Sequence, residues 1–210
     1  MRDLIDTLRE AGERHGDKLV MLCSFQKEES VILHELVKVA PKTRVVTIDT
    51  GVLFPETLSA WRAFEEFYGV HIDVEDARGP WTGPDNCCSV EKVAALERAL
   101  NGADAWVTGI RREQSPTRAD AQLIERDEQR GIVKYNPLAM WSEKDVWRYI
   151  GEHALPYHAL HDQGYSSIGC APCTSKVLPG EDPRAGRWRG WEKVECGIHV
   201  PEKPGEEPVF

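Results

Sequence analysis

Short apolar runs alternate along this chain with segments in which apolar residues follow helical spacing. The runs have the length of strands, and the stretch Val20, Met21 and Leu22 is typical of a strand that is buried on both faces. Strands are predicted at residues 18–25, 43–51, 70–77, 104–110 and 131–138.

The segments between the strands have apolar residues three or four positions apart. Pro55 marks a helix start, Gly69 a helix end, and Ser142 is suited to cap a further helix. Helices are predicted at residues 1–16, 28–40, 55–69, 89–100 and 142–153. This alternation predicts an α/β fold with a mostly parallel sheet and helices on both of its faces.

The periodic pattern fades from about Leu155 onward, where Gly, Pro, Cys, Arg and Trp accumulate. We expect ligand-bearing loops there, laid over the edge of the sheet. Residues 1–190 are predicted to form one domain. Residues 191–210 are rich in Pro, Glu and Gly and are predicted to form a mobile tail.

Charge limits the partners of the chain. With 26 basic and 35 acidic residues its net charge is -9, which opposes binding to nucleic acid and to anionic membranes. No apolar run approaches the roughly 20 residues that span a bilayer. We therefore expect a soluble, cytoplasmic protein that holds any anionic ligand in a local basic pocket.

The turn at residues 24–27 ends the first predicted strand and leads into a helix. Backbone N–H groups at such a turn suit an anion, although Ser24 could be only a local helix cap. The glycines and the Gly-Lys-Ser ending of a Walker A loop are missing. The turn resembles, in degenerate form, the phosphate loop of N-type ATP pyrophosphatases, with Phe25 and Gln26 in place of glycines.

Four of the six cysteines form two close pairs, Cys87 with Cys88 and Cys170 with Cys173. Four thiolates could hold zinc or an iron-sulfur cube, and adjacent cysteines favour the larger cube because their side chains diverge. A thioredoxin-like redox role for the C-x-x-C pair would need a strand directly before it. Cys23 lies in an apolar strand and is interpreted as a core thiol.

Two arginine clusters could hold phosphate or sulfate. Residues 111–118 carry Arg111, Arg112 and Arg118, and residues 184–189 carry three more just before the tail. A single cysteine, Cys196, follows on the polar tail, three residues before His199. A buried residue type in that setting calls for a function other than packing.

Together these motifs resemble the assimilatory sulfonucleotide reductases, and specifically the iron-sulfur type that acts on adenosine 5'-phosphosulfate. The resemblance rests on the Ser24 turn, TIDTG, the cysteine pairs, TGIRREQSPTR, GCAPCT and ECGIH. It implies an adenine-nucleotide α-hydrolase-like fold of the PP-loop type and a 4Fe-4S cluster on Cys87, Cys88, Cys170 and Cys173. It also implies that Cys196 attacks the substrate sulfur, forming an S-sulfonate and AMP, and that thioredoxin or a glutaredoxin-like reductant then releases sulfite. The substrate-binding residues that it implies are Ser24, Phe25, Gln26, Ser30, Ile48, Lys92, Gly109, Arg111, Arg184, Arg187 and His199.

Three alternatives remain open. The substrate could carry a 3'-phosphate, although members of the family with that preference usually lack the cluster cysteines. The chain could instead be an ATP-using thiolation or pyrophosphatase enzyme, or a zinc-binding module without activity. A homo-oligomer is possible.

Overall fold

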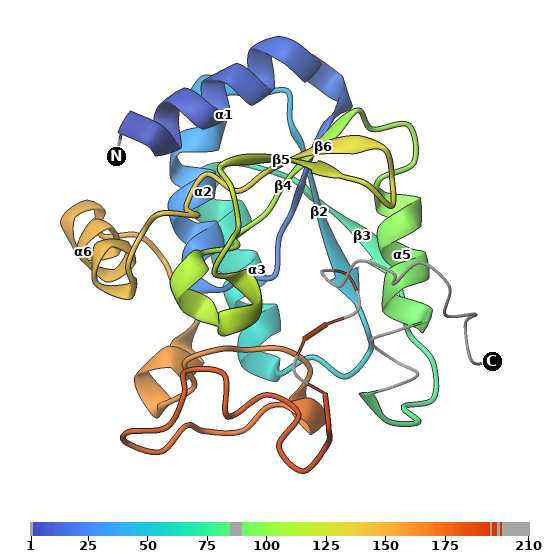
Figure 1. Ribbon diagram of the computed structural model, residues 1–210, viewed down its shortest axis with the longest axis vertical. Coiled ribbons are helices and arrows are strands. Elements are labelled where there is room, and N and C mark those ends of the chain that lie inside the picture. Colours follow the sequence, from blue (N-terminus) through green and yellow to red (C-terminus); the bar gives the residue numbers. More distant parts are fainter. Residues whose placement is uncertain (1, 85–89, 194, 197, 199–210) are drawn as a thin grey trace.

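A computed structural model describes residues 2–84, 90–193, 195, 196 and 198 of the chain. The strands are β1 (Leu19–Leu22), β2 (Arg44–Asp49), β3 (Ile72–Asp76), β4 (Ala105–Val107), β5 (Ile124–Asp127) and β6 (Ile132–Tyr135). They form one sheet in the order β3-β2-β1-β4-β6-β5 (Figure 1).

The sheet is parallel except at one edge. Met21 of β1 is in register with Val45 of β2 on one side and with Val107 of β4 on the other. Among the strands that the structure describes, only β5 runs antiparallel, beside β6. The five predicted strands are confirmed, whereas β5 was missed because its sequence, IERD, has a single apolar residue and no apolar run.

The helices are α1 (Arg2–His15), α2 (Lys27–Val39), α3 (Pro55–Tyr68), α5 (Lys92–Ala99) and α6 (Glu143–His153). Their ends follow the sequence signals. Gly69 has φ 64, the left-handed conformation that ends α3, and Ser142 Oγ accepts a hydrogen bond from the Asp145 amide at the start of α6. The regular part of the helix predicted at 89–100 begins only at Lys92, and Ser89 lies outside the described residues.

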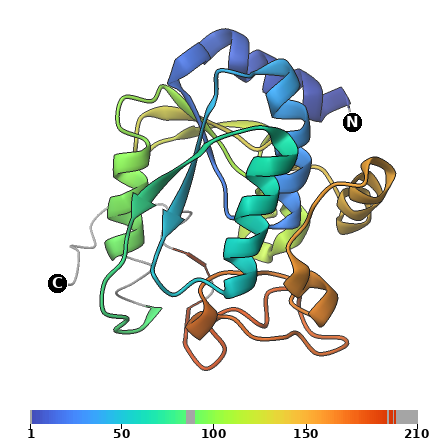
Figure 2. The same cartoon turned by 180° about the vertical axis from the view of Figure 1, so that it is seen from behind.

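Helices cover both faces of the sheet, as predicted. On one face lie α1, α2 and α3, with Leu4, Leu33 and Phe64 in the core, and α6 packs against α2. On the other face, Leu96 of α5 packs with Trp106 of β4. Figures 1 and 2 show α5 on the side of the sheet away from α2 and α3. No helix within the described part of the chain is long and apolar enough to cross a membrane.

The last quarter of the chain is made of loops and 3-10 turns, as predicted. These loops lie below the carboxyl ends of β2 and β3 in Figure 1, drawn in orange and red. Trp188 and Ile198 from this region belong to the core of the α5 face, so the loops are packed onto the domain.

Candidate active site

A cavity of about 620 Å³ lies at the switch point of the sheet, where β2 pairs with one side of β1 and β4 pairs with the other. Its walls come from the turn after β1, the end of β2, the segment after β4, the start of α5 and the C-terminal loops. The carboxyl ends of parallel strands at such a switch point are the usual place for a ligand in open α/β sheets. The volume is within the range of pockets that hold small ligands.

The cavity brings together nine of the predicted substrate-binding residues and two of the predicted cysteines. Ser30 is not among its lining residues, and the Ser30 Oγ instead lies 2.8 Å from the Tyr68 hydroxyl and 2.5 Å from the Pro156 carbonyl oxygen. Cys87, Cys88 and His199 lie outside the described residues. The predicted residues that line the cavity are Ser24, Phe25, Gln26, Ile48, Lys92, Gly109, Arg111, Arg184, Arg187, Cys170 and Cys196.

The turn after β1 has an unusual backbone at Phe25. Its φ of 62 lies in the left-handed region, where glycine is favoured and an aromatic residue is strained. The phenyl ring is fully buried and stacks on Trp61 with ring centroids 5.5 Å apart. Aromatic packing thus holds the turn in a conformation that a glycine adopts at no steric cost.

Gln26 joins this turn to the C-terminal loops. It caps α2 through a capping box with Glu29, whose Oε2 accepts the Gln26 amide at 3.0 Å. Its side-chain Oε1 accepts the Ile168 amide at 2.8 Å, and its Nε2 donates to Ser24 Oγ at 3.2 Å. One side chain therefore fixes both walls of the cavity.

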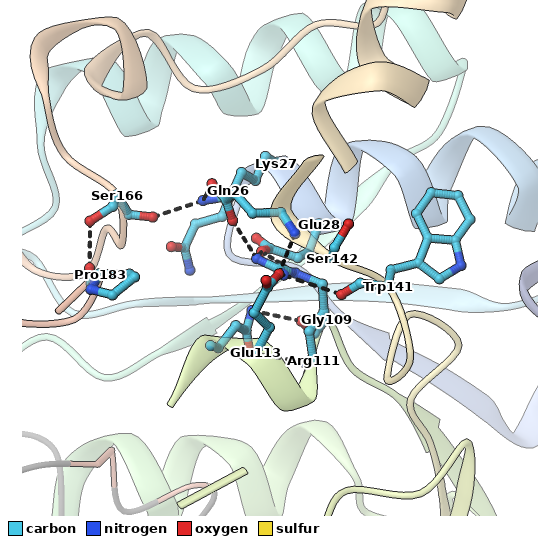
Figure 3. Close-up of polar contacts among 12 residues, drawn as sticks. Gln26, Lys27, Glu28, Gly109, Arg111, Glu113, Trp141, Ser142, Ser166 and Pro183 are labelled. Atoms are coloured by element: carbon cyan, nitrogen blue, oxygen red, sulfur yellow. Dashed lines mark hydrogen bonds and ion pairs between the residues drawn. The ribbon is translucent and has the colours of Figure 1, made fainter. Parts of the chain in front are cut away.

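Arg111 is buried beneath this turn and takes part in a network of charges (Figure 3). Its guanidinium is 2.9 Å from Glu28 and 2.5 Å from Glu143, and Lys27 Nζ is 3.1 Å from Glu143. Burial raises the pKa of Glu28, but Lys27 and Arg111 outweigh this and lower it to about 2. Arg111 lines the cavity, as expected, but its charge is matched by carboxylates of the protein.

Glu29 beside it has the opposite electrostatics. Burial, and then the neighbouring Glu28 charge, raise the pKa of Glu29 to about 8, so its carboxyl is largely protonated at neutral pH. Gly109, which follows β4, packs directly against this pair. A Cβ on Gly109 would meet Glu29 Oε1 at 2.5 Å and Glu28 Cβ at 2.9 Å.

The arginines of the C-terminal loops stack on Trp188. The guanidinium carbons of Arg184 and Arg187 lie 5.6 and 4.4 Å from the Trp188 ring centroid. Each has a buried Nε atom with no hydrogen-bond partner in the described part of the protein. Burial, and then Arg118, lower the pKa of Arg184 to about 10, which leaves it protonated at neutral pH.

Cys196 lines the same cavity and is 5% exposed. It belongs to the core cluster on the α5 face with Trp188 and Ile198. Arg184 and Cys196 are close enough to interact electrostatically. The nucleophile expected from sequence thus faces the basic end of the cavity in this conformation.

Cys170 directly precedes the 3-10 turn Ala171–Cys173 and Cys173 is the last residue of that turn, and both cysteines are buried. Cys170 Sγ is 3.2 Å from Thr50 Oγ1. Burial, and then Cys170, raise the pKa of Cys173, while Trp81, Arg187 and Lys92 act in the opposite direction. Cys23, by contrast, is a fully buried core thiol, as expected.

The two thiols of this turn suit the C-x-x-C half of a four-thiolate metal site. The other two predicted ligands, Cys87 and Cys88, lie outside the described residues. Among the described residues, no group of three or more His, Cys, Asp or Glu side chains could hold a metal ion. Cys170 and Cys173, the two described donors, are free thiols at one turn and fit a metal group that binds thiolates.

Sequence reasoning assigned no role to Lys27 and Glu195, two further residues of the cavity, and predicted Arg118 only as part of an arginine cluster for phosphate or sulfate. Lys27 is buried, and its Nζ donates to the Ser166 carbonyl oxygen at 2.8 Å. Arg118 and Glu195 form an ion pair of 2.7 Å across 77 residues of chain. The only sequence feature that could have indicated Glu195 is its place directly before Cys196. Nothing in the sequence links Glu195 to Arg118.

Comparison with known proteins shows the family of this chain. Residues 18–176 match the family model described as the phosphoadenosine phosphosulfate reductase domain. The phosphoadenosine 5'-phosphosulfate reductase of Gloeobacter violaceus is 44% identical over 92% of this chain and 87% of that protein. The adenosine 5'-phosphosulfate reductase of Staphylococcus haemolyticus is 43% identical over 95% of this chain and 88% of that protein.

A solved structure has the same architecture. The phosphoadenylyl-sulfate reductase of Candida auris, in a phosphate complex, superposes with a TM-score of 0.72 and 29% identity, covering 83% of this chain and 90% of that chain. The fold is therefore the PP-loop nucleotide-binding fold that was expected. With the family model matched over most of its length, the chain belongs to the phosphoadenosine phosphosulfate reductase family.

Proposed function

We propose that this protein reduces adenosine 5'-phosphosulfate to sulfite and AMP in sulfate assimilation, through an S-sulfonate on Cys196. One observation carries the proposal. Cys196 lines the same cavity as the phosphate-loop-like turn at Ser24 and the arginines Arg184 and Arg187. Relatives named adenosine 5'-phosphosulfate reductase, such as those of Staphylococcus haemolyticus and Shouchella clausii, support this substrate.

The first step is a displacement at sulfur. The Cys196 thiolate forms a bond to the sulfur while the bond from sulfur to the bridging oxygen breaks, and AMP leaves with the electron pair. Cationic neighbours favour the thiolate, which is the reactive form of cysteine. Arg184 lies near enough to Cys196 to act in this way. It would also stabilise the charge that develops on the leaving phosphate.

The second step releases sulfite. A thiolate of thioredoxin or of a glutaredoxin-like protein attacks Cys196 Sγ, sulfite leaves, and a mixed disulfide forms. The second thiol of the reductant resolves this disulfide, so that a dithiol is oxidised by two electrons and Cys196 is restored. Cys196 is 5% exposed, so we propose that the tail at 191–210 moves to present the adduct.

Cys170 and Cys173 would hold one side of a 4Fe-4S cluster, and Cys87 and Cys88 would supply the other two thiolates. When bound, such a cluster would supply an anionic centre that crosslinks these two segments beside the substrate site. Lys92, which lines the cavity near Cys173, would offset that charge and orient the sulfate. The thiols favour a reducing compartment, and we propose the cytoplasm.

A second candidate substrate is the 3'-phosphorylated nucleotide. It is favoured by the name of the Gloeobacter violaceus relative, a phosphoadenosine 5'-phosphosulfate reductase. Turnover of the two nucleotides by the purified protein, at matched concentrations with thioredoxin, separates the two. We expect the nucleotide without the 3'-phosphate to have the higher kcat/KM.

The test of the reaction is a single turnover without reductant. Incubation with sulfur-labelled adenosine 5'-phosphosulfate should transfer the label to Cys196 and release one AMP per labelled thiol. Cys196→Ser should bind AMP and take up no label, and Cys23→Ala should be labelled normally. Labelling of the Cys196→Ser protein, or release of pyrophosphate from ATP by the parent, would contradict the proposal.

A further inference from the structure

Glu195 directly precedes Cys196 and is buried between two arginines. Arg118 binds its carboxylate through two nitrogens, at 2.7 and 3.0 Å, and Arg184 Nη2 donates to the same carboxylate at 2.7 Å. Thr117 Oγ1 donates to Glu195 Oε2 at 3.2 Å. Arg118 and then Arg184 hold the pKa of Glu195 below its usual range despite its burial.

These partners belong to separate parts of the fold. Thr117 and Arg118 lie in a 3-10 turn, Pro116–Arg118, in the segment between β4 and β5, and Arg184 lies in the C-terminal loops. Arg118 is held in turn by Gln114, whose Oε1 accepts from Arg118 Nη1 at 2.6 Å. A bidentate pair with a buried carboxylate fixes orientation as well as distance. The backbone next to Cys196 is thus tied to both walls of the cavity.

Some positive charge of the cavity is available to bind a substrate anion near Glu195. Lys27 and Arg111 are matched by Glu28 and Glu143. The described partners of Arg187 are neutral, with Nη1 donating to Ser167 Oγ and to the Ile168 carbonyl oxygen.

Within the described residues, Arg184 and Arg187 each keep a buried Nε atom without a hydrogen-bond partner, and Arg184 is the arginine that binds Glu195. An anion can therefore bind there while Glu195 keeps its ion pairs.

We propose that Glu195 is a positioning residue, which anchors the Cys196 segment to Arg118 and Arg184 so that the thiol faces the bound substrate. The inference rests on the proposed S-sulfonation of Cys196. The ion pairs of Glu195 are proposed to set the rate at which Cys196 is sulfonated, and not the affinity for the nucleotide. Misplacing a nucleophile by about 1 Å costs on the order of 100-fold in rate.

The test compares Glu195→Gln with Glu192→Gln, which removes the same charge from an exposed side chain three residues earlier. In single turnovers without reductant, we expect Glu195→Gln to sulfonate Cys196 about 10- to 100-fold more slowly than the parent. Its affinity for AMP should stay within about threefold or increase, because Arg118 and Arg184 lose an internal anion. Glu192→Gln should match the parent in both measurements.

Alkylation by iodoacetamide gives a readout that does not depend on the substrate. Loss of the anchor should expose the buried thiol, so Cys196 in Glu195→Gln should be labelled several-fold faster than in the parent, as measured on its own peptide. Arg118→Gln should behave in the same way. The double variant should be no slower in sulfonation than the slower single variant, because the two residues act as one unit.

Two results would overturn the inference. One is equal sulfonation rates, or equal labelling rates, in the parent and Glu195→Gln. The other is a parallel fall of sulfonation rate, AMP affinity and melting temperature, which marks a general structural role. If the parent itself forms no S-sulfonate, the proposed function fails, and the labelling comparison still decides whether Glu195 anchors Cys196.

Discussion

Phe25 and Trp61 stack their rings 5.5 Å apart, while the Phe25 backbone is held at φ 62. Removing the ring tests which of the two effects is larger. Phe25→Gly would relieve roughly 1–2 kcal/mol of left-handed strain. It would lose roughly 3–5 kcal/mol of buried aromatic packing. We expect a net loss of about 1–4 kcal/mol in the free energy of unfolding in urea. A variant as stable as the parent would show that the ring does not hold the turn.

Glu29 predicts a pH dependence of stability. Its pKa is raised from 4.5 to about 8 by burial and by Glu28. Between these values the folded protein keeps a proton that the unfolded chain has released, so this group lowers stability as the pH rises through the window. Glu29→Gln preserves the shape of the side chain and should remove this loss.

Urea unfolding at about pH 5 and about pH 8 provides the measurement. The parent should lose more stability than Glu29→Gln between the two conditions. Glu66→Gln, which changes an exposed carboxyl on α3, should behave as the parent does. Parallel pH profiles for the parent and Glu29→Gln would rule out the buried, protonated carboxyl.

Gly109 predicts a close-packing effect at the floor of the cavity. In Gly109→Ala the new methyl group would overlap Glu29 Oε1 and Glu28 Cβ. We expect a loss of roughly 1–3 kcal/mol in stability. AMP affinity, measured by calorimetry, should fall with it because the turn before α2 must shift.

Gly151→Ala is the matched control. Gly151 lies within α6, and nothing comes within 4 Å of a Cβ built on it. Alanine should raise stability there by about 0.5–1 kcal/mol, since it loses less backbone entropy in a helix. If both variants lose stability equally, the contact with Glu29 is not the cause.

Cys170 and Cys173 predict the metal content. Protein purified without oxygen should be brown and contain iron, and Cys170→Ser or Cys173→Ser should lose both the iron and the visible absorbance. Cys23→Ala should keep them, because Cys23 lies in the core on the other face of the sheet. Zinc in place of iron in the parent would favour a four-thiolate zinc site.

Local patterns determined most of the fold. In the described part of the chain, the apolar runs and helical spacings predicted five of the six strands and the five α-helices, because each depends on neighbours within one element. The charged strand β5 escaped, since its place beside β6 comes from tertiary pairing and not from its own sequence. The cysteine spacing and the Ser24 turn were visible for the same reason, as short motifs with a chemical meaning.

The sequence by itself determined the fold class, the cysteine pair at 170 and 173, and the residues to consider as ligands. Only the tertiary structure decided which side chains these residues contact. It matched Arg111 to Glu28 and Glu143, turned Ser30 to Tyr68, and brought Arg118 to Glu195 across 77 residues. A buried charge must find a partner wherever the chain folds back, and sequence spacing does not record that partner.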